Sequence, residues 1–190
     1  MSKFPKKIKL PDGVEVELRT MTADDRDAVL DFARSLPEED LLFLRVDLTK
    51  PEVVDDWISN IESGNSSSLV VYSGESFIGY ATVHRTTARW TRKVGEIRIN
   101  VAPDFRARGL GRVLTSEIFD LARELGLKKL MANMTTDQKG AQAAFGRLGF
   151  VAEALLADFV EDSEGTARDL VIMSYNVDGH SEQADDRVRI

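Results

Sequence analysis

The most constraining feature of the sequence is a set of apolar residues between positions 110 and 125 that recur at spacings of three and four. This spacing places them on one side of an α-helix, and Gly126 ends that helix in the usual way. Strand-like segments precede the helix at 94–101 and follow it at 129–134. A strand, a helix and a second strand in succession predict an α/β fold. The apolar residues are Leu110, Val113, Leu114, Ile118, Leu121 and Leu125.

The remaining segments extend this alternation of strands and helices. Thr22 and Asp25 have the spacing of a capping box, which predicts a helix after Thr22. We expect one α/β domain over residues 1–176, with about seven strands and helices on both faces of the sheet, and then a polar tail at 177–190. The other predicted strands span 14–18, 69–72, 77–84, 150–160 and 168–176, and further helices are predicted from Pro51 and over 138–148.

Cysteine usage and hydropathy limit the kind of protein this can be. The chain of 190 residues has no cysteine, which excludes disulfides, thiolate zinc sites and a cysteine nucleophile. Its first segment, MSKFPKKIKL, is basic but lacks the apolar core of a signal peptide, and no apolar run approaches membrane-spanning length. We therefore predict a cytoplasmic protein that does not partner with membranes.

Charge and histidine content bear on two further kinds of site. The net charge is -7, from 32 acidic and 25 basic side chains. An acidic surface repels phosphate backbones, so nucleic-acid binding is not expected. His84 and His180 are the only histidines and lie far apart in the sequence, so a histidine-rich metal site is excluded and no metal cofactor is expected. We expect His84 on a strand surface or in a cleft.

The stretch from Val101 to Arg112 joins the strand at 94–101 to the strongest helix, and it has the residues of an anion-binding loop. A helix start leaves backbone N–H groups unpaired and carries a partial positive charge, which suits a phosphate. Glycines there let the backbone come close to an anion, and arginines add charge. The alternative is an ordinary helix start with a solvated basic edge. The loop comprises Arg106, Ala107, Arg108, Gly109, Leu110, Gly111 and Arg112 and contains neither GxGxxG nor GxxxxGK[ST].

Three short motifs give the chain a resemblance to a known family. Arg106-x-x-Gly109-x-Gly111 matches the signature [QR]-x-x-G-x-[GA], and Val101-x-Pro103 stands just before it. Downstream, the run from Phe145 to Phe150 is similar to the segment Y-x-K-x-G-F. The chain thus resembles the GNAT superfamily of acetyl-CoA-dependent N-acetyltransferases. The order of elements from 14 to 176 also follows the fold of that family, which implies a mixed sheet.

The resemblance implies a cofactor site and a reaction. Backbone groups of Ile99 and Val101 would pair with the pantetheine arm of acetyl-CoA, and the N–H groups of 106–112 would hold its pyrophosphate. Gln138 falls where the family often has an asparagine that contacts the cofactor arm. The implied reaction transfers an acetyl group from acetyl-CoA to a primary amine, either of a small molecule or of a protein lysine or N-terminus.

Glu96 is the candidate general base. It faces the same way as Arg98 and Asn100 in the predicted strand, and it stands five residues before Val101, where many members of the family carry a catalytic glutamate. An amine arrives protonated, so some group must take its proton before it can attack the thioester. The alternative is a glutamate on a solvated strand face, which is common for charged residues.

One position departs from the family pattern. Phe145 replaces the tyrosine thought to protonate the leaving thiolate. Tyr80, Tyr175 or water could substitute for it, or the thiolate could leave without an acid. The alternative function is therefore a catalytically idle CoA-binding or sensing module. The N-terminal segment from Leu18 through Leu41 to Arg45 looks similar to single-domain members that acetylate protein lysines. The acceptor, with a small polyamine or amino acid also possible, the acyl chain length and the oligomeric state stay open, with a homodimer among the options.

Overall fold

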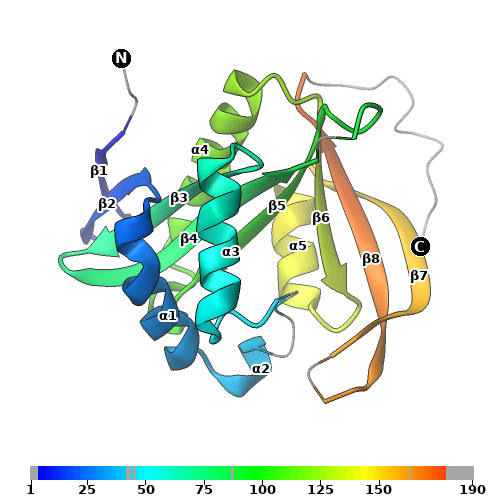
Figure 1. Cartoon of the computed structure of the whole chain (residues 1–190), viewed down its shortest axis with the longest axis horizontal. Helices are drawn as coiled ribbons and strands as arrows, with labels where there is room; N and C mark the ends of the chain where they lie inside the picture. The colour runs from blue at the N-terminus through cyan, green and yellow to red at the C-terminus, as the bar shows by residue number, and fades with distance from the viewer. Residues whose placement is uncertain (1–3, 42–43, 45, 87, 163, 179–190) are drawn as a thin grey trace.

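The strands of the protein form one mixed sheet of eight strands in the order β1-β2-β3-β4-β5-β6-β8-β7 (Figure 1). The structure, a computed structural model, describes residues 4–41, 44, 46–86, 88–162 and 164–178. Neighbouring strands are antiparallel except β5 and β6, which are parallel. The strands are β1 (Lys6–Lys9), β2 (Glu15–Thr20), β3 (Ser66–Ser73), β4 (Ser76–Arg85), β5 (Val94–Val101), β6 (Lys129–Thr135), β7 (Val151–Glu161) and β8 (Ala167–Asn176).

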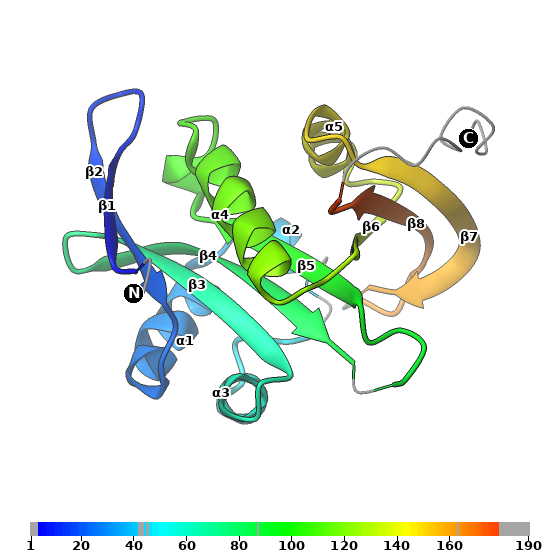
Figure 2. The same ribbon diagram turned by 90° about the horizontal axis from the view of Figure 1, so that it is seen from above.

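Helices cover both faces of this sheet, as predicted (Figure 2). One long helix, α4, lies across one face and connects β5 to β6, while α1 and α3 cover the other face. The helices are α1 (Arg26–Ser35), α2 (Glu38–Leu41), α3 (Pro51–Glu62), α4 (Leu110–Glu124) and α5 (Lys139–Arg147), with short 3-10 turns η1 (Ala23–Asp25) and η2 (Pro103–Phe105).

Two hydrophobic cores hold the helices to the sheet. On the α4 face, Leu110, Leu114 and Ile118 are fully buried, so the spacing that predicted this helix also sets its packing. On the other face, Val29 of α1 and Trp57 of α3 are buried in the second core. The capping box before α1 is confirmed, with the Thr22 N–H donating to the Asp25 carboxylate at 2.9 Å. Both faces are therefore fixed by apolar burial, which leaves the middle of the sheet rigid.

The prediction of about seven strands was one short, because β1 was not recognised. Its sequence, KKIK, has three lysines and one apolar residue, so it lacks the alternation over a longer run that marks a strand. It pairs with β2 at the edge of the sheet, with Ile8 opposite Val16. Lysines on an edge strand discourage pairing with another chain, which explains the polar composition.

The end of the described chain is packed against the domain. Val177 is buried, and its N–H donates to the carbonyl of Lys128 at 2.9 Å. Residues 179–190 of the predicted tail, together with His180, lie outside the described residues. Within the described part of the chain, no helix is both long and apolar enough to cross a membrane.

Candidate functional site

The loop between β5 and α4 enters the helix through two residues in the left-handed backbone conformation. Ala107 and Gly109 both have positive φ values, 57° and 90°, and the second of these residues caps α4. A positive φ is uncommon for alanine, so the path of the loop is a specific one. Across this fully described stretch, no side chain caps the helix and the first turn of α4 holds no acidic residue. The positive end of the helix dipole is therefore uncompensated, as a phosphate site requires.

The two glycines of this loop serve different purposes. Gly109 needs its positive φ, and a Cβ there would come within 3.1 Å of Pro11. A Cβ at Gly111 would meet nothing within 4 Å, so this residue is not required by the packing of the protein itself. The open space at Gly111 is what a close approach by a ligand would need.

The loop arginines are held by the protein to different degrees. Arg106 donates to the Val101 carbonyl at 3.1 Å and to Asp40 at 2.6 Å. Arg108 is hydrogen-bonded to Asp12, and its guanidinium lies 4.7 Å from the centre of the Phe105 ring. These two side chains therefore brace the loop.

The third arginine of the loop, Arg112, is exposed. Since the side chains of Arg106 and Arg108 are bonded within the protein, the loop offers an anion its backbone N–H groups and the side chain of Arg112.

Strands β5 and β6 diverge near the end of β5 that leads into this loop. Their pairing ends at Glu96 opposite Met131, although β5 continues to Val101 and β6 continues to Thr135. In the antiparallel ladder with β4, alternate residues of β5 turn their backbone groups toward β4. The Ala102 N–H donates to β4, at the Ile78 carbonyl, so the backbone groups of Ile99 and Val101 face the opening.

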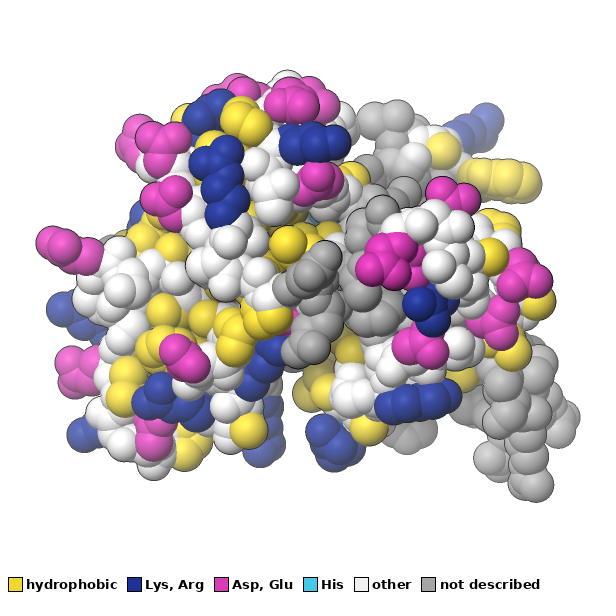
Figure 3. Space-filling model, turned by 90° about the horizontal axis from the view of Figure 1, so that it is seen from below, with side chains coloured by type: hydrophobic (Ala, Val, Ile, Leu, Met, Phe, Trp, Pro, Cys, Tyr) yellow, Lys and Arg dark blue, Asp and Glu magenta, His cyan; other side chains and the backbone are white. Residues whose placement is uncertain are grey.

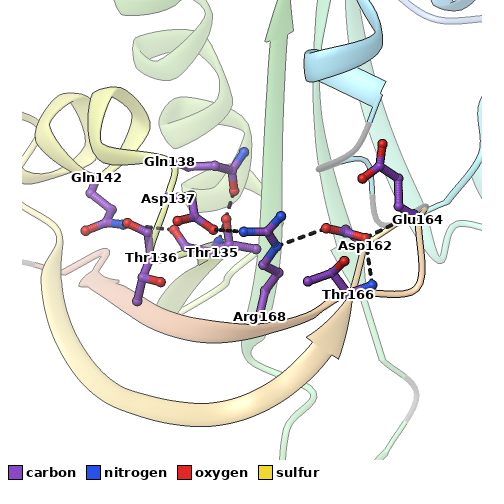
Figure 4. A network of polar contacts seen from close by, with 9 residues as sticks. All are labelled: Thr135, Thr136, Asp137, Gln138, Gln142, Asp162, Glu164, Thr166 and Arg168. Atoms are coloured by element: carbon purple, nitrogen blue, oxygen red, sulfur yellow. Dashed lines mark hydrogen bonds and ion pairs between the residues drawn. The ribbon is translucent and has the colours of Figure 1, made fainter.

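Beside this opening, the turn between β6 and α5 carries Gln138. Its side-chain oxygen accepts a hydrogen bond from the Thr135 N–H at 3.0 Å (Figure 4). Gln142 donates to the carbonyls of Thr135 and Thr136, at 2.8 and 3.1 Å. The amide group at 138 is thus oriented by the turn, with its nitrogen left to donate elsewhere.

The opening between the two strands contains a cavity of about 600 Å³, here called the β5–β6 cavity. It is seen in Figure 3 as a hollow between the part of the molecule that carries β1 to β5 and the part that carries β6 to β8, with Lys and Arg side chains on both sides. Glu96, Ile99, Gln138 and Phe145 line this cavity, whereas the loop at 106–112 lies outside its lining. The structure thus brings Glu96 and Ile99 of β5 together with two residues from much later in the sequence, Gln138 and Phe145.

A second cavity, here called the α3 cavity, lies between α3 and the sheet and has a volume of about 740 Å³. Trp57 of α3 and His84 of β4 are among its lining residues, so His84 is a cleft residue, as expected. The two cavities have four lining residues in common: Leu44, Tyr80, Glu96 and Arg98. They therefore meet at the middle of β5.

Glu96 stands at this junction. Its carboxylate accepts a hydrogen bond from the Arg98 guanidinium at 3.1 Å, and the two side chains are 23% and 25% exposed, respectively. His84 lies opposite Glu96 in the pairing of β4 with β5, and its Nδ1 is 2.8 Å from the Ser66 hydroxyl. The candidate base is therefore neither a core residue nor on an open surface.

The two tyrosines considered as acids have different surroundings. Tyr175 is partly buried and packs against the core on the α4 face, with its ring centre 4.7 Å from that of Phe119. Tyr80 lines both cavities, and burial raises its pKa to about 12, although the charge of Arg98 and a hydrogen bond with Asn100 act in the opposite direction. Tyr80 thus keeps its proton at physiological pH.

A polar network on the β7–β8 side of the β5–β6 cavity was not predicted. Arg168 bridges Asp162 at 2.9 Å and Asp137 at 3.2 Å (Figure 4). The N–H of Thr166 and the Arg168 guanidinium hold the pKa of Asp162 below its usual range. Asp162 lies near Arg168 across the turn between β7 and β8, whereas Asp137 comes close only because β8 pairs with β6. Among the described residues, no group of three or more His, Asp or Glu side chains is arranged to hold a metal ion.

Comparison with known proteins agrees with this arrangement. Residues 30–150 match the model of the acetyltransferase (GNAT) family. Streptothricin acetyltransferase from Streptomyces lavendulae is 32% identical over 90 residues. That match covers 47% of this chain and 47% of the relative, so it spans about half the length of each.

Solved structures share the fold. The yncA protein of Salmonella typhimurium, solved with its cofactor acetyl-CoA, matches 87% of this chain and 96% of its own, with a TM-score of 0.75 and 21% identity. Ribosomal-protein-alanine N-acetyltransferase from Brucella melitensis matches 84% of this chain and 98% of its own, with a TM-score of 0.74 and 24% identity. The structural matches establish the fold, and the family match covers more than half of the sequence. The chain belongs to the acetyltransferase (GNAT) family.

Proposed function

We propose that the protein transfers an acetyl group from acetyl-CoA to a primary amine. The observation that carries this proposal is the position of Glu96, where the pairing of β5 with β6 ends and the two cavities meet. A thioester in the β5–β6 cavity and an amine in the α3 cavity would reach each other at this carboxylate. One carboxylate at the junction of two substrate cavities is the arrangement that a direct transfer needs.

We assign acetyl-CoA to the opening between β5 and β6 and to the loop that connects β5 to α4. The N–H groups of residues 107–112 would bind the pyrophosphate, because this helix start is uncompensated and Gly111 leaves room. The N–H of Arg106, which the sequence included in this set, donates instead to the Pro103 carbonyl at 3.1 Å. Backbone groups of Ile99 and Val101 would bind the pantetheine arm, and the Gln138 amide would donate to it. These residues lie around the opening between β5 and β6 and in the loop that follows β5, so a long, thin ligand could contact them one after another.

The proposed chemistry uses few protein groups. Acetyl-CoA supplies the activated acetyl group as a thioester. Glu96 takes a proton from the acceptor ammonium, directly or through water, and the amine nitrogen then forms a bond to the carbonyl carbon as the carbon–sulfur bond breaks. Backbone N–H groups near Val101 would polarise the carbonyl. The nitrogen then loses its second proton, which reaches the thiolate through water. No protein acid is needed, because a thiol pKa near 8.5 makes the thiolate a fair leaving group.

Phe145 keeps a second function open, that of an idle CoA-binding or sensing module. It lines the β5–β6 cavity, and the motif resemblance assigns to this position the tyrosine that would act as the acid. Tyr80 is the tyrosine that could supply a proton instead, because it lines both cavities, whereas Tyr175 lines neither of them.

One assay separates these two functions. The protein is incubated with acetyl-CoA and a panel of amines while free thiol is followed, and the melting temperature is measured with acetyl-CoA alone. An enzyme gives amine-dependent thiol release, whereas an idle module gives a melting-temperature shift and no release with any amine. If the protein shows neither thiol release nor a melting-temperature shift, both functions are excluded.

The remaining assignments are proposals of the same kind. A net charge of -7 supports an acceptor that is not a nucleic acid. We keep a cytoplasmic location, a domain ending near residue 176 and the option of a homodimer as proposals.

A further inference from the structure

We propose that the acceptor is a zwitterion, an α-amino acid or a close analogue, whose amino group faces Glu96 and whose carboxylate faces Arg98. This inference rests on the proposed function and names its substrate class. The starting observation is the ion pair of Glu96 and Arg98, in which opposite charges stand 3.1 Å apart. The amino and carboxylate groups of an α-amino acid are attached to the same carbon, so they present the complementary pair of charges at similar spacing.

Burial makes this complementarity matter. About three quarters of each of the two side chains is out of solvent, with 23% of Glu96 and 25% of Arg98 exposed. A charge in such surroundings is costly unless it is paired. An acceptor with only an ammonium group would draw Glu96 away and leave the guanidinium without this partner. A zwitterion exchanges one ion pair for two and leaves neither protein charge uncompensated.

The charges of the α3 cavity also fit a molecule with no net charge. Its described lining has two carboxylates, Asp56 and Glu96, and two guanidinium groups, Arg85 and Arg98, in addition to His84. A polyamine would bring several ammonium groups close to the two arginines. The described lining therefore disfavours a polycation. The lysine side chain of a protein acceptor carries only an ammonium group, so it would leave Arg98 without a role in acceptor binding.

The rest of the α3 cavity provides a place for an apolar side chain. Leu48 and Trp57 are 4% and 7% exposed, and Leu44 and Val53 complete this wall. The cavity volume of about 740 Å³ lies in the range of small-molecule sites, roughly 300–1,000 Å³. An amino acid with a branched aliphatic side chain would therefore place its three groups on three matching surfaces.

The reaction then balances within the site. One ammonium proton passes to Glu96, and the nitrogen forms a bond to the carbonyl carbon as the carbon–sulfur bond breaks. The nitrogen then loses a second proton, which reaches the thiolate through water, and Glu96 returns its own proton to solvent. The product is an N-acetyl amino acid that keeps its carboxylate near Arg98 but has lost the charge that paired with Glu96. Product release is favoured by this loss.

The test compares four acceptors with saturating acetyl-CoA. Leucine, leucinamide and 3-methylbutylamine share the same branched carbon skeleton, and spermidine represents the polyamines. We expect kcat/KM for leucine to exceed those for leucinamide and 3-methylbutylamine by at least about tenfold, the scale of one charge-assisted contact. In Arg98→Gln, the ratio of leucine to 3-methylbutylamine should fall by at least about tenfold. In Arg123→Gln, an exposed position on α4 with the same change in charge, this ratio should stay at the wild-type value.

Each other outcome has one meaning. If none of a broad panel of amines releases thiol, the proposed function fails. If amines react but leucine has no advantage over 3-methylbutylamine, or spermidine is the best acceptor, the zwitterion proposal is overturned while the proposed function stands. A leucine preference that survives Arg98→Gln would likewise overturn the assignment of Arg98. Unchanged stabilisation by acetyl-CoA in Arg98→Gln shows that the variant is folded.

Discussion

The end of β5 and its middle offer a ligand different kinds of group. At the end, from Val101 into α4, the available groups are backbone N–H and C=O, and the side chains of Arg106 and Arg108 are bonded to the protein itself. In the middle, the groups that line the cavities are the side chains of Glu96 and Arg98. A backbone site depends on where the chain runs, whereas a side-chain site depends on which residue is present. Substitutions in the two regions should therefore fail in different ways.

The largest effect is expected in the middle of β5. Glu96→Gln should lower the rate of acetyl transfer about 10²–10⁴-fold near neutral pH, the usual scale of general base catalysis. The affinity for acetyl-CoA should hardly change, because Glu96 faces the acceptor. Single-turnover rates and calorimetric titration measure the two quantities separately. As a control, Glu75→Gln makes the same change in charge in the turn between β3 and β4. Wild-type turnover in Glu96→Gln would mean that this glutamate only belongs to a solvated strand face.

The next effect tests the backbone region. Gly111→Glu should remove the stabilisation that acetyl-CoA gives, which for the wild type is about 2.7 kcal/mol at a ligand concentration of about 100 times Kd. Since an added Cβ meets nothing within 4 Å, the loss would come from the ligand side and not from a damaged fold. The matched control is Gly146→Glu on α5, where an added Cβ also meets nothing within 4 Å. If Gly111→Glu is stabilised as strongly as the wild type, the phosphate-loop assignment is wrong.

A smaller effect is expected at Phe145, which lies between the two regions. Restoring the family residue with Phe145→Tyr should change the single-turnover rate by less than about tenfold, or roughly 1.4 kcal/mol in barrier. The reason is that a thiolate leaves without an acid and the field of the α4 N-terminus helps to stabilise it. A hundredfold gain would show that the wild type lacks an acid and would favour the idle module.

The smallest effect separates the arginines of the loop. Arg112→Ala should weaken acetyl-CoA binding by less than about fivefold, or about 1 kcal/mol, because an exposed charge contributes little. The difference should shrink further at high salt, where exposed charges are screened. Titrations at low and high ionic strength measure it. A loss as large as that in Gly111→Glu would mean that side chains, not backbone groups, bind the pyrophosphate.

The sequence predicted local features well and long-range pairings poorly. The spacing from Leu110 to Leu125 predicted α4 because residues three and four apart lie on the same side of a helix. The short strand β1 was missed because its lysines carry no such pattern. The braces of the phosphate loop could not be predicted, because Asp12 and Asp40 lie 96 and 66 residues away from their arginine partners.

The candidate site shows the same division. A strand places Glu96 and Arg98 on one face, so their proximity follows from the sequence. The α3 cavity does not follow from the sequence, because it forms only when α3 packs on the face of the sheet that contains β4. That Glu96 lies where two cavities meet is known only from the fold, and its catalytic role stays a prediction.

The most direct test of the account is the ratio of wild-type to Glu96→Gln single-turnover rates as a function of pH, with saturating acetyl-CoA. Rising pH supplies free amine without a base, so the ratio should fall steadily from pH 7 toward pH 10 if Glu96 removes the proton. Burial raises the pKa of Tyr80 to about 12, so this tyrosine stays protonated over the whole range and does not contribute to the change. A ratio that stays constant with pH would contradict the account, because Glu96 would then act by some means other than proton removal.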